Sequence, residues 1–243
     1  MNEIKRRKLL FAAQDKAEKK ISAVLVKHFS QRFKQLKRDI RKMPPFRKQL
    51  AKSGGVYDLR KDTLNDWREW IRKFNLDIIA ALLLMTGDIF NVEDLYFLSN
   101  GFPPNAEFNI DQFIQDYQTN IGQYITDIGQ ATLEATQSEI VAWYQSEGSL
   151  SDLITSLEKY YSPARAAMIA RTETNKLSSA IAAQEMRYYG ITQWQWNSIR
   201  EDNTCEFCLD MHGQIFNLDD EMPPDAAHPN CACYCTYVYD GVT

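Results

Sequence analysis

The first 204 residues of this 243-residue sequence contain no cysteine. The sequence also lacks any apolar run near the ~20 residues that a membrane-spanning helix requires. Its best apolar run, Ile78–Met85, has eight residues and indicates a buried helix segment. The first residues, Met1–Lys8, lack the apolar core of a secretory signal. We therefore expect no membrane span, and a protein made in a reducing cytosol.

Catalytic signatures are missing as well. The sequence has no phosphate-binding glycine loop, no Gly-x-Ser-x-Gly elbow and no His-Glu-x-x-His helix. Its hydrophobic fraction of 44% and charged fraction of 25% are ordinary for a globular protein with a real core. The sequence therefore predicts a folded protein that is not an enzyme.

Positive charge is nearly confined to the N-terminal quarter. Residues 1–60 carry 18 Lys or Arg against 5 Asp or Glu, whereas no Lys or Arg occurs from Phe74 to Glu158. Such a segment is either a solvated helix face, a surface for an acidic protein, or a contact for the phosphates of nucleic acid. The candidate phosphate contacts are Lys5, Arg6, Arg7, Lys8, Lys34, Lys37, Arg38, Arg41 and Lys42.

Hydrophobic periodicity predicts a mainly helical fold. Apolar residues recur every three to five positions over 3–42, and Pro44-Pro45 ends that helix. His28 lies on this apolar stripe and is expected to be a packed core residue. Further helices are expected from about Asp62, over Asp88–Leu98, from Ile110 toward Trp143, and after Ser149.

The C-terminal part combines one more helix with a small β element. Ser162-Pro163 is a typical helix start, and Gly190 a typical helix end. Polar and aromatic residues then alternate within Ile191–Ile199, which indicates a strand. The expected fold is thus mainly α with a small C-terminal α+β zinc-knuckle lobe.

All five cysteines lie in one closely spaced group. Cys205-x2-Cys208 is followed after 22 residues by Cys231-x-Cys233-x-Cys235, with His228 just before. Two short turns of thiolates and an imidazole are typical of a closed tetrahedral zinc site. A disulfide pair is disfavoured by the odd count and the cytosolic origin, and inert buried thiols are the remaining alternative.

The ligand set is left open by the spacing. The metal candidates are Cys205, Cys208, His228, Cys231 and Cys233. If the chain from Cys231 to Val238 is a strand, the last three cysteines share one face and Cys235 is expected in the core. His212 is followed by Gly213 in an expected turn and is a poor ligand candidate. We expect structural Zn²⁺ as the cofactor.

The order of motifs in the last third resembles one known family. Ala170-Arg171-Thr172-Glu173 is followed by Trp196, Thr204-Cys205-x2-Cys208, Pro223-Pro224 and His228-Pro229-Asn230-Cys231-Ala232-Cys233. Together they resemble the phage head morphogenesis family, the Mu F-like minor head proteins, over about residues 120–243. Two positions depart from the family pattern, because Asn203 and Ala232 stand where arginine is usual.

The resemblance implies a minor head protein of a tailed phage. Such proteins are made beside the portal and act in head assembly inside the virion, so the implied partners are the portal, other head proteins and packaged double-stranded DNA. The implied domains are a basic helical arm over 1–52, a helical region over 56–119, and a Mu F-like domain over 120–243 with its zinc lobe at 191–243.

Two functional alternatives stay open at the level of sequence. Arg171 and Glu173 are two positions apart on a helix and cannot face each other as an acid/base pair. We interpret them, together with Asp202, as a structural brace of the zinc lobe rather than as catalytic groups. The alternative to an assembly protein is a zinc-dependent nuclease or a toxin-like enzyme delivered with the genome.

Overall fold

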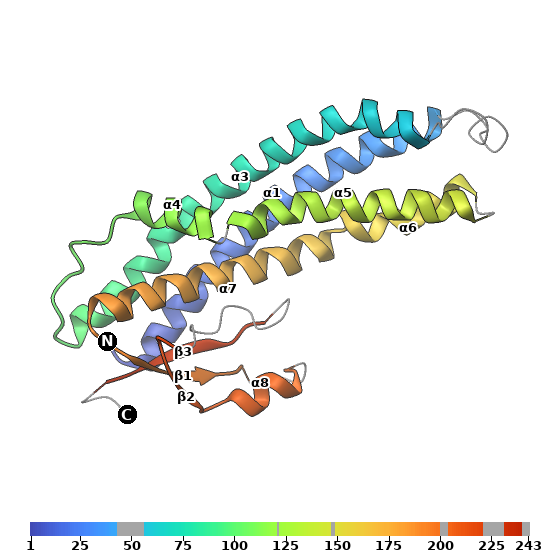
Figure 1. Cartoon of the computed structure of the whole chain (residues 1–243). Helices are drawn as coiled ribbons and strands as arrows, with labels where there is room; N and C mark the ends of the chain where they lie inside the picture. Colours follow the sequence, from blue (N-terminus) through green and yellow to red (C-terminus); the bar gives the residue numbers. More distant parts are fainter. Residues whose placement is uncertain (43–55, 121, 147–148, 200–203, 221–230, 240–243) are drawn as a thin grey trace. The chain divides into compact units, whose positions relative to one another are not determined.

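The computed structural model describes residues 1–42, 56–120, 122–146, 149–199, 204–220 and 231–239 (Figure 1). Long helices dominate, and three short strands lie near the C-terminus, which confirms a mainly helical fold with a small β element. The helices are α1 (Glu3–Lys42), α3 (Val56–Ser99), α4 (Ile110–Asn120), α5 (Gly122–Gln145), α6 (Leu150–Glu158), the 3₁₀ turn η1 (Lys159–Tyr161), α7 (Pro163–Tyr188) and α8 (Glu206–Met211). The strands are β1 (Gln193–Asn197), β2 (Ile215–Asn217) and β3 (Tyr234–Val238).

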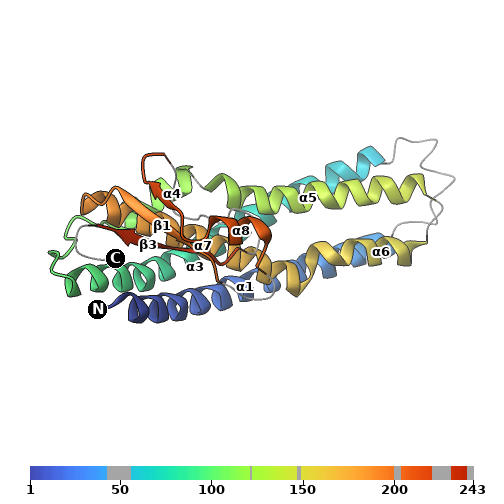
Figure 2. The same ribbon diagram turned by 90° about the horizontal axis from the view of Figure 1, so that it is seen from below.

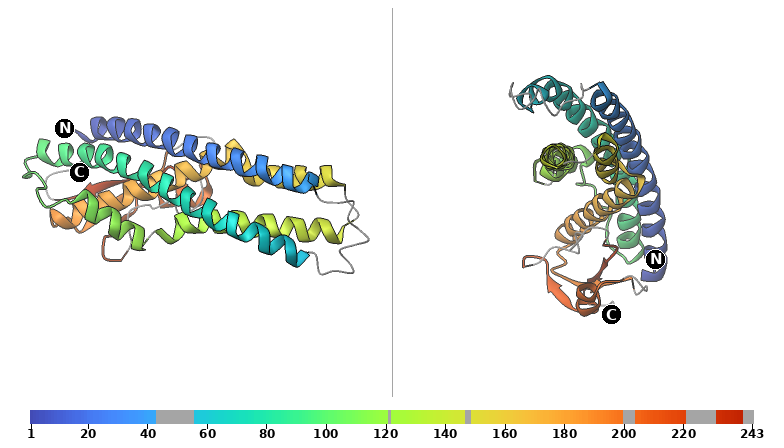
Figure 3. Two further views of the ribbon diagram at one scale, coloured as in Figure 1. Left: turned by 90° about the horizontal axis from the view of Figure 1, so that it is seen from above. Right: turned by 90° about the vertical axis from the view of Figure 1, so that its right-hand side faces the viewer.

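The chain forms two compact units, neither of which is one continuous stretch. The first contains Met1–Ser22, Ala80–Tyr117 and Ala167–Thr243, and the second contains Ala23–Ile79 and Gln118–Ala166. The long helices α1 and α3 (Figure 3) each contribute to both units. The boundary expected after residue 52 lies outside the described residues.

The helix α3 is longer than the sequence pattern indicated. Two helices were expected, from Asp62 and over Asp88–Leu98, and the structure has one uninterrupted helix over Val56–Ser99. Gly87 lies inside this helix, where a single glycine costs only about 1 kcal/mol relative to alanine. The helix expected from Ile110 is described as α4 and α5, on either side of residue 121, which lies outside the described residues.

One helix segment among the described residues, Trp67–Ser99, is long and apolar enough to cross a membrane by length and composition. Length and composition are weak evidence for a membrane span, because a core helix of a soluble protein can be equally long and apolar. Buried residues on this helix include Phe74, Ile78, Met85 and Ile89. Some of the apolar side chains of this helix are therefore buried in the core of the protein.

The second unit is built on aromatic packing between α1 and α3. The rings of Phe29 and Phe74 stack at 6.0 Å, and the Arg32 guanidinium lies 4.0 Å from the centre of the Trp67 ring. His28 is buried, and its Nε2 lies 2.8 Å from an Asp77 carboxylate oxygen. The expectation that His28 is a packed core residue is confirmed.

The helix α7 begins and ends where the sequence indicated. The Ser162 hydroxyl accepts a hydrogen bond from the Arg165 backbone N–H at 3.2 Å, just before Pro163. At the other end Gly190 has φ +68°. The Gly190 N–H donates to the Arg187 carbonyl and the Ile191 N–H to the Met186 carbonyl, a Schellman end that glycine favours.

The three strands form an antiparallel sheet in the order β2-β1-β3. Trp194 lies opposite Phe216 on one side and Tyr237 on the other, and Trp196 lies opposite Cys235. The buried face of this sheet packs against apolar residues of α7, including Ala182, Ala183 and Met186. Figure 2 shows the strands and α8 beside α7. This core positions the cysteines.

Candidate metal centre

The first cysteine turn is organised by the start of α8. Cys205 is the N-cap residue of this helix, and its Sγ accepts a hydrogen bond from the Cys208 backbone N–H at 3.4 Å. Cys205 is half-buried in this turn. Cys208 lies in the core, and only 2% of this residue is exposed. The Cys-x2-Cys spacing thus works as a helix cap.

The second cysteine turn leads into β3. The strand begins at Tyr234, so Cys231 and Cys233 precede it instead of lying within it as expected. The alternation nevertheless holds, because Cys231, Cys233 and Cys235 are buried while Ala232 is exposed. Cys235 packs in the core, as the sequence predicted.

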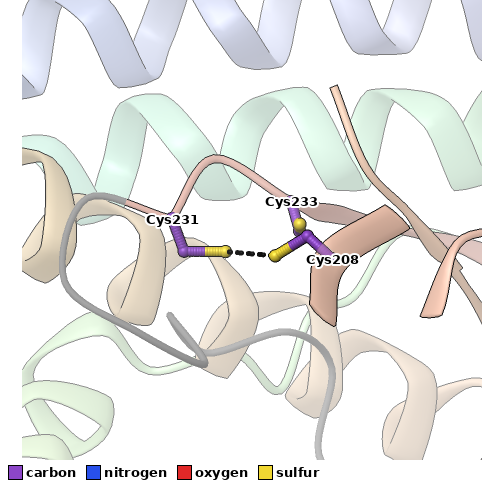
Figure 4. A group of neighbouring side chains, drawn as sticks. All are labelled: Cys208, Cys231 and Cys233. Carbon is purple, nitrogen blue, oxygen red and sulfur yellow. Dashed lines mark hydrogen bonds between the residues drawn. The ribbon is translucent and has the colours of Figure 1, made fainter. Parts of the chain in front are cut away.

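Three thiols from the two turns meet in the interior (Figure 4). The sulfur atoms of Cys208, Cys231 and Cys233 all lie within 4.8 Å of one another, and those of Cys208 and Cys231 are 3.8 Å apart. A tetrahedral zinc with Zn–S bonds of ~2.3 Å requires sulfur atoms separated by about 3.8 Å. Residues from both turns therefore fit three corners of a zinc site.

The fourth corner has two candidates. Cys205 is the neighbour of Cys208 in the first turn, and its sulfur interacts with the Cys208 thiol. His228, the other expected ligand, lies outside the described residues. The sequence spacing did not decide whether Cys231 or Cys233 is a ligand. Both belong to the group of three neighbouring thiols.

The surroundings raise the pKa of two of these thiols, Cys208 and Cys233. Burial raises the pKa of Cys208 to about 12, with the neighbouring Cys205 and Cys231 thiols adding to the effect. The pKa of Cys233 is raised even further, first by its hydrogen bond with Cys231 and then by burial. A bound cation supplies the compensating charge that lets such thiols ionise. The donor set is therefore suited to a soft or borderline divalent metal.

The other histidine near the first turn makes a different contact. His212 Nδ1 accepts a hydrogen bond from the Ser198 backbone N–H at 3.1 Å. Gly213 follows with φ +84°, which confirms the expected turn. His212 is thus engaged in holding the end of β1.

Two of the three expected brace residues, Arg171 and Glu173, lie on α7. Arg171 Nε donates to Glu18 of α1 at 3.3 Å, so this contact joins two helices. Glu173 is buried and pairs with Lys176 on the same helix at 3.4 Å, while its Oε2 has no hydrogen-bond partner among the described residues. Burial raises the pKa of Glu173, against the opposing effect of Lys176. Asp202 lies outside the described residues.

A residue that the sequence did not single out touches the cysteine turn. Asn175 Nδ2 donates to the Cys231 carbonyl at 3.3 Å, and only 6% of Asn175 is exposed. No spacing rule in the sequence pointed to it. The Arg-Thr-Glu segment thus lies next to a residue that meets the second cysteine turn.

Arg6 requires a correction among the candidate phosphate contacts. Only 1% of it is exposed, and its guanidinium donates to both carboxylate oxygens of Glu93, at 2.7 and 3.0 Å. It also donates to the Cys235 carbonyl at 3.2 Å and lies 4.3 Å from the centre of the Tyr237 ring. Arg6 is therefore an interior residue of the first unit and is not available to phosphate.

Most of the remaining basic candidates are at the surface. Lys37 is half-buried over the Phe33 ring, and Arg7 lies over the rings of Phe11 and Tyr234 while staying exposed. The Lys42 side chain lies outside the description. The other exposed candidates are Lys5, Lys8, Lys34, Arg38 and Arg41.

These features define a helical protein whose C-terminal lobe is organised around a buried group of cysteines. Residues 131–238 match the family model described as phage Mu protein F like protein. The match lies inside the range 120–243 that the motifs indicated, and it confirms the resemblance to this family. Searches of curated proteins and of solved structures found no match.

Proposed function

We propose that this chain is a minor head protein of a tailed phage that acts in head morphogenesis at the portal or the capsid interior. The observation that carries the proposal is the Mu F-like match over residues 131–238, which includes the whole cysteine group. In this function the protein is made in the host cytoplasm and is carried in the virion. Its partners are the portal and other head proteins.

The proposed role of the cysteine group is structural. A zinc ion is held by Cys208, Cys231 and Cys233, with Cys205 or His228 as the fourth ligand. Zinc at such a site supplies folding free energy, because the ligands have no preformed arrangement in the unfolded chain. The small sheet has only three short strands, and a lobe of this size gains stability from a metal.

We further propose that the exposed basic side chains of α1 contact packaged DNA. Lys5, Lys8, Lys34 and Arg41 are exposed side chains of this helix. Contact of such residues with phosphates requires no base recognition, which suits DNA of any sequence. Arg6 takes no part, because it is buried.

The test of the function uses the phage that encodes this chain. An affinity-tagged chain is expected to be present in purified virions by mass spectrometry, and to co-purify with the portal protein from infected cells. Deletion of its gene is expected to yield defective heads that the wild-type gene restores. Normal heads without the protein, and its absence from virions, would contradict an assembly role.

The enzymatic alternative is tested on the purified chain. Metal-dependent cleavage of DNA or RNA that is lost in Cys208→Ala, in a variant that keeps its helical content, would replace the structural assignment. An assembly protein is expected to cleave neither nucleic acid with or without added zinc.

A further inference from the structure

The second cysteine turn is bonded to a helix outside the sheet. The ladder between β1 and β3 ends at the pair Asn197 and Tyr234, and Tyr234 lies three residues after Cys231. The Cys231 carbonyl accepts a hydrogen bond from Asn175 on α7. Both residues are buried, so this bond is shielded from competition by water.

A second buried donor faces the same group of thiols from β1. Trp196 lies directly opposite Cys235, and Cys233 is two residues before Cys235 with its side chain on the same buried side. The indole Nε1–H is buried, and the Trp196 side chain interacts with that of Cys233.

A buried N–H is expected to have an acceptor, because native interiors satisfy almost all such donors. A sulfur atom accepts such a donor far better as a thiolate than as a thiol, since charge-assisted hydrogen bonds are the stronger ones. Ionisation of Cys233 by a metal would therefore give the Trp196 donor a stronger acceptor. The two side chains act on the two cysteines of one turn.

We propose that Asn175 and Trp196 are positioning residues of the metal centre. Asn175 holds the backbone at Cys231, and Trp196 donates through Nε1–H to the Cys233 thiolate. This inference rests on the proposed metal site, and it assigns the support of that site to α7 and β1, outside the cysteine turns. Such outer hydrogen bonds orient ligands and tune the metal they hold.

The Asn175 role is tested with the full chain and with Co²⁺ and Zn²⁺ as probes. Asn175→Leu is expected to weaken metal affinity, measured by competition with a chelator, by about ten- to a hundredfold. Asn105→Leu is the matched control. Asn105 is equally buried, with 8% exposed, and its Nδ2 donates at 2.7 Å to Glu185 instead of a cysteine turn. The control is expected to keep the wild-type affinity.

The Trp196 role has a spectroscopic test. Trp196→Phe keeps an aromatic ring but removes the N–H, so the thiolate-to-Co²⁺ charge-transfer band is expected to move to longer wavelength. Trp194→Phe removes the same group from the neighbouring buried position on the strand, and is expected to leave the band in place. An unshifted band in Trp196→Phe would overturn the role of the indole.

The outcomes separate this inference from the metal site on which it rests. If the wild-type chain binds neither ion, both proposals fail. If it binds metal and Asn175→Leu binds it equally well, the positioning role fails and the metal site stands. Should Asn175→Leu not fold, Asn175→Asp has the same shape without the donor, and the same loss of affinity is expected of it.

Discussion

Arg6 and Glu93 form a buried, two-pronged ion pair that joins the first turns of α1 to α3, at 2.7 and 3.0 Å. The pair is extended by Tyr237, whose hydroxyl donates to Glu93 Oε2 at 2.8 Å, and by the bond from Arg6 to the Cys235 carbonyl. The strand that follows the second cysteine turn is thus fastened to the N-terminal helix. Residues outside the matched range 131–238 complete the core of the region that matches the Mu F-like family.

This relationship predicts a large cost for removing one partner. Arg6→Leu leaves the Glu93 carboxylate buried without its cation, so the free energy of unfolding is expected to fall by about 3–5 kcal/mol. Urea unfolding followed by circular dichroism measures it. Lys5→Leu changes the exposed neighbouring residue and is expected to cost less than about 0.5 kcal/mol.

A double variant distinguishes the ion pair from general damage to packing. Arg6→Met combined with Glu93→Leu replaces the pair by apolar side chains, and is expected to regain part of the lost stability. The recovery is incomplete, because the Tyr237 hydroxyl loses its acceptor. If the double variant is as unstable as the sum of the two single variants, the charges are not coupled.

The position of Arg6 also shows what could not be predicted from the sequence. It was grouped with Lys5, Arg7 and Lys8 by composition, yet it lies one turn before the buried Leu10 on the apolar side of α1. The position of Arg6 around the helix axis, on the same side as the buried apolar residues, therefore indicated that Arg6 is buried. Its partners Glu93 and Cys235 are 87 and 229 residues away, and no local pattern identifies contacts at such separations.

Local chemistry was a better guide at the ends of α7 and in the cysteine turns. The caps at Ser162 and Gly190 and the core position of Cys235 follow from rules that act over a few residues. The length of α3 did not follow, because a helix tolerates a single glycine such as Gly87. Asn175 could not be found, since a buried asparagine on a helix has no signature until its acceptor is known.

Removal of the metal is expected to affect the lobe selectively. Cys208→Ala is expected to abolish the zinc that native mass spectrometry detects on the wild-type chain, and to lower the thermal stability of the lobe. Cys235→Ala is the matched control, because Cys235 is equally buried but outside the group of three thiols. This control is expected to lose some packing energy and keep one zinc per chain; loss of metal in both variants would assign Cys235 to the site.

Stability is also expected to depend on pH through Glu185. Burial raises the pKa of this carboxyl from 4.5 to about 7, and the charges of Asp94 and Glu93 act in the same direction against the hydrogen bond from Asn105. Between these two values the folded chain holds a proton that the unfolded chain has released. Stability from this group therefore falls as the pH rises from about 4.5 to 7, and is lost above that range.

Glu185→Gln tests this dependence because it fixes the neutral form. The variant is expected to show a flatter loss of melting temperature between pH 5 and pH 8, and to be more stable than the wild type at pH 8. Glu134→Gln, at an exposed position, is expected to follow the wild-type profile. Equal slopes for Glu185→Gln and the wild type would show that another group governs this range.

The basic surface of α1 predicts binding of DNA that depends strongly on salt. Replacing Lys5, Lys8, Lys34 and Arg41 by glutamine removes four exposed charges and is expected to weaken binding to any duplex sequence. It is also expected to reduce the slope of log affinity against log salt by up to about 0.9 for each lost phosphate contact. Fluorescence anisotropy over a series of salt concentrations measures both effects. The matched control replaces Arg68, Arg72, Lys73 and Arg187, four exposed cations outside α1, and is expected to change the slope less. Binding that does not respond to salt, or that is equal in the two variants, would remove DNA from the partners of this helix.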